Sequence, residues 1–182
     1  MKKTLFFLVF IVTILSCKNE NTSNPDSFEN QEDVLDESFN VILDVIMKKD
    51  DVIALYYTTD GTTDFTKIEP IWKDVKGSEL VQQVVYRLPE NVTQPTEFRF
   101  DFGRNPQQED VFLKKVTFKY IGKEREIGCP ELVDFFRADD NYCTFDHLTG
   151  LIHAKKGANG ETLFPSLYPH EKNLLEELQK IY

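Results

Sequence analysis

The chain has 182 residues, of which 31 are acidic and 21 are basic, and its formal net charge is −10 at pH 7. An acidic chain lacks the surplus of Lys and Arg that neutralises phosphates, so the composition argues against nucleic acid as a partner. The length suits a single folded domain.

The N-terminus has the pattern of an export signal. Lys2 and Lys3 supply positive charge, and an apolar run over residues 5–15 follows. This run is too short to cross a bilayer, which takes about 20 apolar residues, but it suits the apolar region of a signal peptide. We therefore predict a signal peptide over residues 1–16.

The segment Ile14-Leu15-Ser16-Cys17 resembles the lipobox of bacterial lipoprotein precursors. The resemblance implies cleavage after Ser16 and lipid attached to Cys17, which would anchor the protein to a membrane of the cell envelope, at the surface or on the periplasmic face of the outer membrane. An ordinary secretory signal with an incidental cysteine is the alternative. The mature chain would have 19 basic and 31 acidic residues, so attraction to anionic lipid is not expected.

Residues 17–38 form the next segment, a predicted flexible tether. Residues 18–38 contain seven acidic residues and one lysine, with many Asn, Ser and Thr, and so cannot bury a core. The start of the tether, Lys18-Asn19-Glu20, partly resembles the surface-export signal of Bacteroidetes lipoproteins. It has Asn19 where those signals prefer an acid.

From Phe39 onward, apolar and polar residues alternate with the two-residue period of a strand. Phe98, Phe100 and Phe102 are the clearest example, because polar residues lie between them. The pattern predicts strands over 39–47, 52–58, part of 65–75, 84–88, 98–102, 112–120 and 124–127. Short strands separated by Gly, Pro and Asp turns predict a mostly β domain over residues 39–182, an antiparallel two-sheet β-sandwich of jelly-roll type.

Two helices are expected near the C-terminus. The first covers residues 130–137, and the second covers residues 169–182, where Pro169 suits a helix start. A hairpin and a loop are expected between them, over residues 142–168. The apolar stripes predicted for these helices are Leu132, Val133, Phe135 and Phe136 in the first, and Leu174, Leu175, Leu178 and Ile181 in the second.

The layout of residues 39–127 resembles the galactose-binding-like jelly-roll modules of bacterial surface carbohydrate proteins. The resemblance rests on Ile71-Trp72-Lys73, Gly77-Ser78, Leu88-Pro89 and the run from Phe98 to Gly103. It implies a non-catalytic glycan-binding module, although that fold also serves other ligands and structural roles.

Cys129 and Cys143 remain as a pair once Cys17 is assigned to lipid. In an oxidising compartment such a pair most often closes a disulfide, which we predict here. The alternative is a zinc site that adds His147 and His153, but structural zinc sites usually contain closely spaced ligand pairs.

Residues for catalysis are not evident. The sequence has no G-x-S-x-G, H-E-x-x-H or Gly-rich phosphate loop, so we expect no enzyme. A small glycan hydrolase remains an alternative, because two of many carboxylates can lie at a workable separation by chance.

Candidate ligand-binding residues are Trp72, Tyr57, Arg99 and Asp101. A tryptophan ring can stack on a sugar, but a core position is favoured for Trp72 because Ile68 is expected on the same side of its strand. Arg99 and Asp101 should face outward together, either to bind vicinal hydroxyls or as a surface ion pair.

No cofactor is expected, although a calcium ion bound between Asp60 and Asp64 is an alternative. Taken together, the sequence predicts a lipid-anchored module that binds glycan or supports a glycan-handling complex. The alternative is a structural or protein-interaction lipoprotein whose C-terminal helix docks on a partner.

Overall fold

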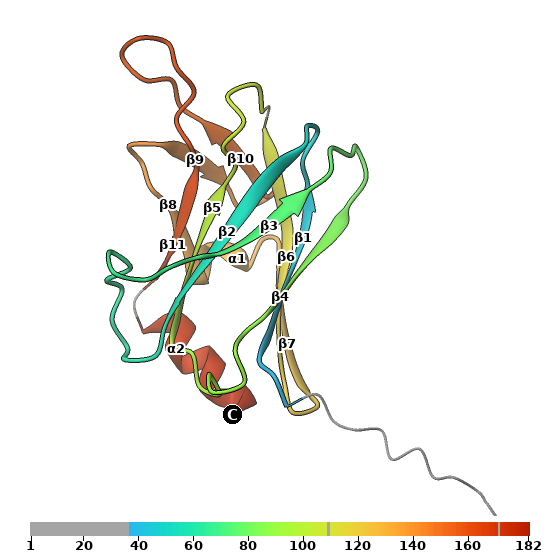
Figure 1. Cartoon of the computed structure of the whole chain (residues 1–182), viewed down its shortest axis with the longest axis vertical. Helices are drawn as coiled ribbons and strands as arrows, with labels where there is room; N and C mark the ends of the chain where they lie inside the picture. The colour runs from blue at the N-terminus through green and yellow to red at the C-terminus, as the bar shows by residue number, and fades with distance from the viewer. Residues whose placement is uncertain (1–36, 109, 171) are drawn as a thin grey trace, which may run out of the picture. The chain divides into compact units, whose positions relative to one another are not determined.

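The computed structural model describes residues 37–108, 110–170 and 172–182. The predicted signal peptide, Cys17 and nearly all of the tether therefore lie outside the described residues. The described part contains two antiparallel sheets that face each other (Figure 1). The prediction of an antiparallel two-sheet β-sandwich is confirmed.

The first sheet has six strands, and β6 pairs along one edge with β1 and along the other with both β10 and β7. Its path runs β4-β1-β6-β10-β9, with β7 beside β6. The strands are β1 (Asn40–Ile46), β4 (Gln82–Arg87), β6 (Val111–Tyr120), β7 (Lys123–Gly128), β9 (Cys143–Asp146) and β10 (Leu151–Ala154).

The second sheet has five strands in the order β3-β2-β5-β11-β8. Two of its neighbours, β5 and β11, are more than sixty residues apart in the chain. The strands are β2 (Asp51–Thr58), β3 (Ile71–Val75), β5 (Glu97–Phe102), β8 (Phe136–Ala138) and β11 (Ser166–Pro169).

The core lies between the two sheets, and the strand residues in it are mostly those that the alternation placed on one face. Phe98, Phe100 and Phe102 are fully buried, as predicted. The ring of Phe98 contacts those of Phe39 and Phe118, whereas the ring of Phe100 contacts those of Phe102 and Phe136 in its own sheet. Because the side-chain period of a strand is two, the residues between these phenylalanines must face outward. The outer face of the five-stranded sheet is therefore determined by the same pattern.

The predicted helix over residues 130–137 is much shorter in the structure, where α1 covers only Leu132–Phe135. Phe136 is already extended and begins β8, which pairs with β11. Val133, which was predicted to be buried, is 37% exposed. The apolar residues of this segment belong to one helical turn and then to a strand. Periodicity alone does not show where the helix ends and the strand begins.

The C-terminal helix begins later than predicted. Pro169 ends strand β11, and α2 covers Asn173–Leu178, followed by a 3₁₀ turn, η1, over Gln179–Ile181. The side chains of Leu174, Leu178 and Ile181 belong to the core between the sheets. Figure 1 shows α2 at one end of the sandwich. The apolar side of this helix is therefore used within its own domain.

Candidate binding surface

The outer face of the five-stranded sheet gathers aromatic and charged side chains in two neighbouring rows. In one row, Ala54 of β2 lies between Trp72 of β3 and Asp101 of β5. In the next row, Tyr56 pairs with Arg99, and Tyr168 of β11 pairs with Arg137 of β8. We call this surface, together with the adjoining Arg104, the aromatic–arginine face; it comprises Tyr56, Trp72, Arg99, Asp101, Arg104, Arg137 and Tyr168.

Arg99 is held at the centre of this face. Its Nε and Nη2 donate to the two carboxylate oxygens of Asp101, at 2.7 and 2.8 Å. Its guanidinium carbon lies 4.8 Å from the ring centre of Tyr56 and 4.6 Å from that of Tyr168. Two hydrogen bonds and two ring contacts leave the guanidinium little freedom, so it is presented in one orientation.

Burial and charge determine the protonation states at this centre. Burial opposes the charge on Arg99, but the hydrogen bonds and the negative charge of Asp101 outweigh it and raise the pKa of the guanidinium. Burial, with the charge of Asp101 added, raises the pKa of Tyr56 and Tyr168. At neutral pH the centre therefore contains a charged Arg99 between two neutral phenols.

Trp72 lies on the outer face rather than in the core, so the favoured core position is wrong. Its side chain is 37% exposed, and the guanidinium carbon of Arg104 lies 3.7 Å from its ring centre. The strand β3 begins only at Ile71, so Ile68 is in the preceding loop and says nothing about the side of Trp72. Ala54 is completely buried beneath its larger neighbours in this row.

Asp51 fixes the backbone that carries Arg104. Its Oδ1 accepts hydrogen bonds from the backbone N–H groups of Val52, Arg104 and Asn105, at 2.8, 2.6 and 3.1 Å. Gly103, with φ of +88°, brings the chain so close that an added Cβ would lie 2.6 Å from Oδ2 of Asp51. The start of the loop after β5 is thus tied to the start of β2.

The loop between β2 and β3 covers one side of the face. It returns Phe65 to the sheet, where the ring is 4% exposed and lies 6.4 Å from the ring of Tyr56 and 6.2 Å from that of Tyr168. Both contacts are edge-on, a favourable arrangement for aromatic pairs. Phe65 therefore supports the two tyrosines that enclose Arg99.

Of the four predicted ligand-binding residues, the structure brings together Trp72, Arg99 and Asp101 but not Tyr57. Tyr57 points to the opposite side of β2, where it packs against the core. Tyr56, and not Tyr57, lies on the outer face beside Arg99. The sequence also gave no indication of Tyr168, Arg104 or Arg137, because their positions depend on which strands pair across the sheet.

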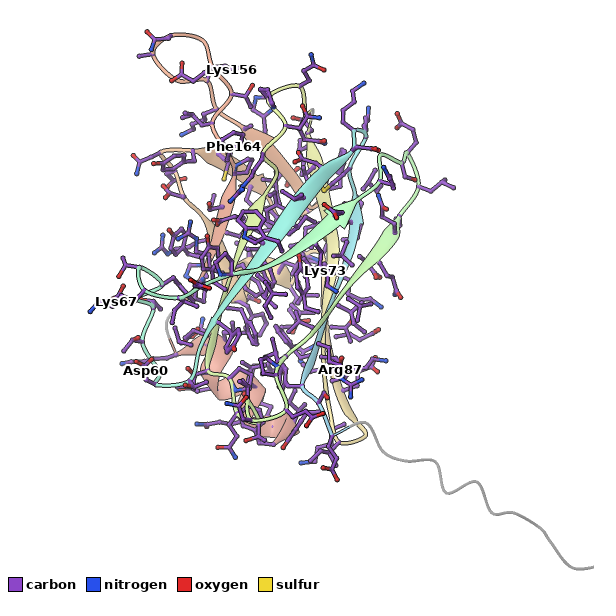
Figure 2. All side chains as sticks on the ribbon, in the orientation of Figure 1. Asp60, Lys67, Lys73, Arg87, Lys156 and Phe164 are labelled. Atoms are coloured by element: carbon purple, nitrogen blue, oxygen red, sulfur yellow. The ribbon has the colours of Figure 1, made fainter. Side chains whose placement is uncertain are left out.

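Asp60 and Asp64 use their carboxylates within their own loop. Oδ1 of Asp60 accepts from the N–H and hydroxyl of Thr62 at 3.1 and 2.8 Å, and Oδ1 of Asp64 accepts from the N–H and hydroxyl of Thr66 at 3.0 and 2.6 Å. Figure 2 shows Asp60 and Lys67 on this projecting loop. Among the described residues, no three His, Cys, Asp or Glu side chains gather closely enough to hold a metal ion.

A hollow beside the loop between β2 and β3 is lined by acidic groups, so it is the place to look for the carboxylates of the hydrolase alternative. It measures about 340 Å³ and is lined by Tyr57, Asp60, Asp64, Lys67 and Glu69, among others. Hydrogen bonds from Thr62 and Thr66 lower the pKa of Asp60 and Asp64. A glycoside hydrolase needs a carboxylic acid with a raised pKa as proton donor, so these two residues are unsuited to that role.

The predicted disulfide is absent, since Cys129 and Cys143 are both free thiols. Cys129 lies against Gly150, just before β10, whereas Cys143 pairs with Ala154 at the end of that strand. Four residues of strand separate these positions by roughly 13 Å, well beyond the ~7 Å that a disulfide permits between Cα atoms. The thiols donate instead to the carbonyl oxygens of Leu113 and Ser166, at 3.6 and 3.5 Å.

No protein family, curated protein or solved structure matches this chain. The resemblance to galactose-binding-like modules therefore stays a prediction, and the function has to be argued from the side chains themselves. Within the described ranges, no helix has the length and apolar character needed to cross a membrane.

Proposed function

We propose that the protein is a membrane-anchored, non-catalytic lipoprotein that binds glycan through the aromatic–arginine face. The observation that carries the proposal is the exposed Trp72 beside the half-buried cluster of Arg99, Asp101 and two tyrosines. Aromatic rings stack on the apolar faces of sugars, while phenols, guanidinium and carboxylate groups form hydrogen bonds with hydroxyls. Both kinds of group are present on one surface.

Rigidity of the face supports binding. Arg99 is fixed by Asp101 and by the rings of Tyr56 and Tyr168, and their side chains come from three strands of one sheet. A group that is already ordered loses little conformational entropy when a ligand arrives, which favours affinity.

The rival proposal, a protein-interaction lipoprotein, has lost one of its supports. It relied on an apolar C-terminal helix that could dock on a partner, but Leu174, Leu178 and Ile181 pack into the core of this domain. A different surface would have to bind the partner.

A glycan array tests the proposal. The chain expressed from Lys18, without the signal peptide and Cys17, should bind at least one class of oligosaccharide. Trp72→Ala should weaken that binding at least tenfold, about 1.4 kcal/mol, because the stacking surface is removed. Val85→Ala is the matched control, since Val85 is 46% exposed but belongs to the other sheet, and it should leave binding unchanged.

A blank array with a natively folded protein would contradict glycan binding and favour the protein-interaction alternative. Equal loss of binding in the Trp72 and Val85 variants would contradict the assignment of the surface. Circular dichroism and the thermal midpoint of each variant show whether the fold is intact.

Membrane attachment through Cys17 is a separate part of the proposal. It rests on the lipobox-like segment at residues 14–17. In cells that process bacterial lipoproteins, the full chain should fractionate with membranes and incorporate labelled palmitate. Cys17→Ala should abolish the label and release the protein, whereas Cys129→Ala should retain both. A labelled, membrane-bound Cys17→Ala variant would contradict the anchor.

A further inference from the structure

The distribution of arginine in this acidic protein is uneven. The chain has five arginines, and three of them, Arg99, Arg104 and Arg137, stack on rings of the aromatic–arginine face. Of the other two, Arg87 donates to Ser38 and Arg125 pairs with acidic groups near the C-terminal helix. In a chain with a net charge of −10, the outer face of one sheet thus concentrates three of the five arginines.

The three arginines of this face differ in their partners. Arg99 is neutralised by the two-point contact with Asp101. Among the described residues, Arg104 and Arg137 form no ion pair. The guanidinium carbon of Arg104 lies 3.7 Å from the ring centre of Trp72, and that of Arg137 lies 5.6 Å from the ring centre of Tyr168. Within the described part of the chain, each of these two guanidinium groups therefore lies against a ring and has no carboxylate paired with it.

These two charges lie on opposite sides of the Arg99–Asp101 pair. Trp72, which contacts Arg104, is on the edge strand β3, and Arg137 is on the opposite edge strand β8. Four interstrand steps separate these strands, which is roughly 19 Å. A ligand that meets both guanidinium groups must be extended and must carry anionic groups at more than one position.

We infer that the ligand is an acidic glycan whose sugar units carry carboxylates, bound across the strands of the aromatic–arginine face between Arg104 and Arg137. The inference rests on the proposed glycan-binding function and adds the chemical class of the sugar. A guanidinium binds a carboxylate through two parallel hydrogen bonds, which matches a planar uronate group. The rings of Trp72 and Tyr168 would meet the adjoining sugar faces.

The overall negative charge of the protein means that any preference for acidic glycans has to come from the two guanidinium groups of this face. A net charge of −10 repels polyanions in general, so an acidic glycan gains nothing from nonspecific attraction. Affinity should therefore depend on the two guanidinium groups individually and should fall as salt rises, because both are exposed and their charges are screened.

The test compares four probes of similar length by isothermal titration: oligogalacturonate, its fully methyl-esterified form, a neutral galacto-oligosaccharide and a sulfated oligosaccharide. The chain expressed from Lys18 should bind oligogalacturonate at least tenfold more tightly than the methyl ester. Arg104→Gln and Arg137→Gln should each reduce this affinity about five- to tenfold, a larger loss than either causes for the neutral probes. Arg87→Gln, which removes an arginine from the other sheet, should change affinity less than twofold.

The outcomes separate this inference from the proposed function. Equal affinity for charged and neutral probes, with no effect of Arg104→Gln or Arg137→Gln, would overturn the inference but leave glycan binding in place. Binding of the sulfated probe without binding of oligogalacturonate would overturn the assignment to carboxylates. If none of the probes binds and the glycan array is also blank, the proposed function itself fails.

Discussion

Arg99 and Asp101 lie on the same strand, two residues apart, and form a two-point ion pair at 2.7 and 2.8 Å on the outer face of the sheet. Their side chains are only 22% and 17% exposed. A charged group in such a setting depends on its partner, because removing one leaves the other partly desolvated and unpaired. The ion pair is therefore expected to stabilise the fold as well as to shape the binding surface.

Asp101→Ala should lower the free energy of unfolding by about 1–3 kcal/mol, the range for losing a hydrogen-bond partner of a partly buried charge. Urea denaturation measures the change. Lys76→Ala is the control, because the Lys76–Asp50 pair has a similar length of 2.7 Å but its side chains are 87% and 66% exposed. Its effect should stay within about 0.5 kcal/mol. Equal effects of the two substitutions would show that Asp101 is an ordinary surface residue.

Gly150 should tolerate no side chain. Its φ is +76°, and an added Cβ would lie 2.1 Å from the carbonyl oxygen of Leu113. Gly160 has a similar φ of +82° but nothing within 4 Å of its added Cβ. Gly160→Ala should therefore cost only the backbone strain of about 1–2 kcal/mol, whereas Gly150→Ala should cost clearly more, as measured by chemical denaturation. Similar values for the two variants would contradict the close approach at Gly150.

Leu178→Ala tests whether the C-terminal helix belongs to the core. Leu178 is fully buried, so truncation should lower the free energy of unfolding by about 2–5 kcal/mol. Leu80→Ala provides the comparison, since Leu80 is 77% exposed and should matter by no more than about 0.5 kcal/mol. A helix that docks only on a partner would make the two variants indistinguishable in thermal and urea unfolding of the isolated protein.

The free thiols can be counted chemically. Burial raises the pKa of Cys129 and Cys143, so few thiolates exist at neutral pH and the native protein should react slowly with a thiol reagent. In urea without reductant, the chain expressed from Lys18 should show two reactive thiols, and reductant should not shift its thermal midpoint. A chain with no titratable thiol, destabilised by reductant, would restore the disulfide.

Asp146 gives a pH dependence with a defined sign. The hydroxyl of Thr149 and the N–H of Leu148 lower its pKa from the usual 3.8. Between the native pKa and the higher unfolded pKa, Asp146 binds more protons in the unfolded chain than in the native one. The stability that Asp146 contributes is therefore present above about pH 4 and is lost as the pH falls through the lower native pKa. Asp146→Asn should flatten the acid limb of the stability curve, measured by urea titrations from pH 6 to pH 2. An unchanged acid limb would assign the dependence to other carboxylates.

Local periodicity was sufficient for most of the strands. Alternation at Phe98, Phe100 and Phe102 predicted both a strand and its buried face, because side-chain direction along a strand depends only on the neighbouring residues. For the same reason Arg99 and Asp101 were correctly placed together outside the core. The predicted helix ranges were wrong at Phe136 and Pro169. Both residues belong to strands, because they pair with each other across the sheet although they are distant in sequence.

Sequence by itself therefore determined the β class, the inward faces of most strands and the proximity of Arg99 to Asp101. Only the tertiary structure decided that β5 lies between β2 and β11, which places Arg99 between the rings of Tyr56 and Tyr168. It likewise decided that Trp72 is exposed and that Cys129 and Cys143 are apart. The physical reason is that strand order and register arise from packing between distant segments, whereas side-chain alternation is a property of each segment alone.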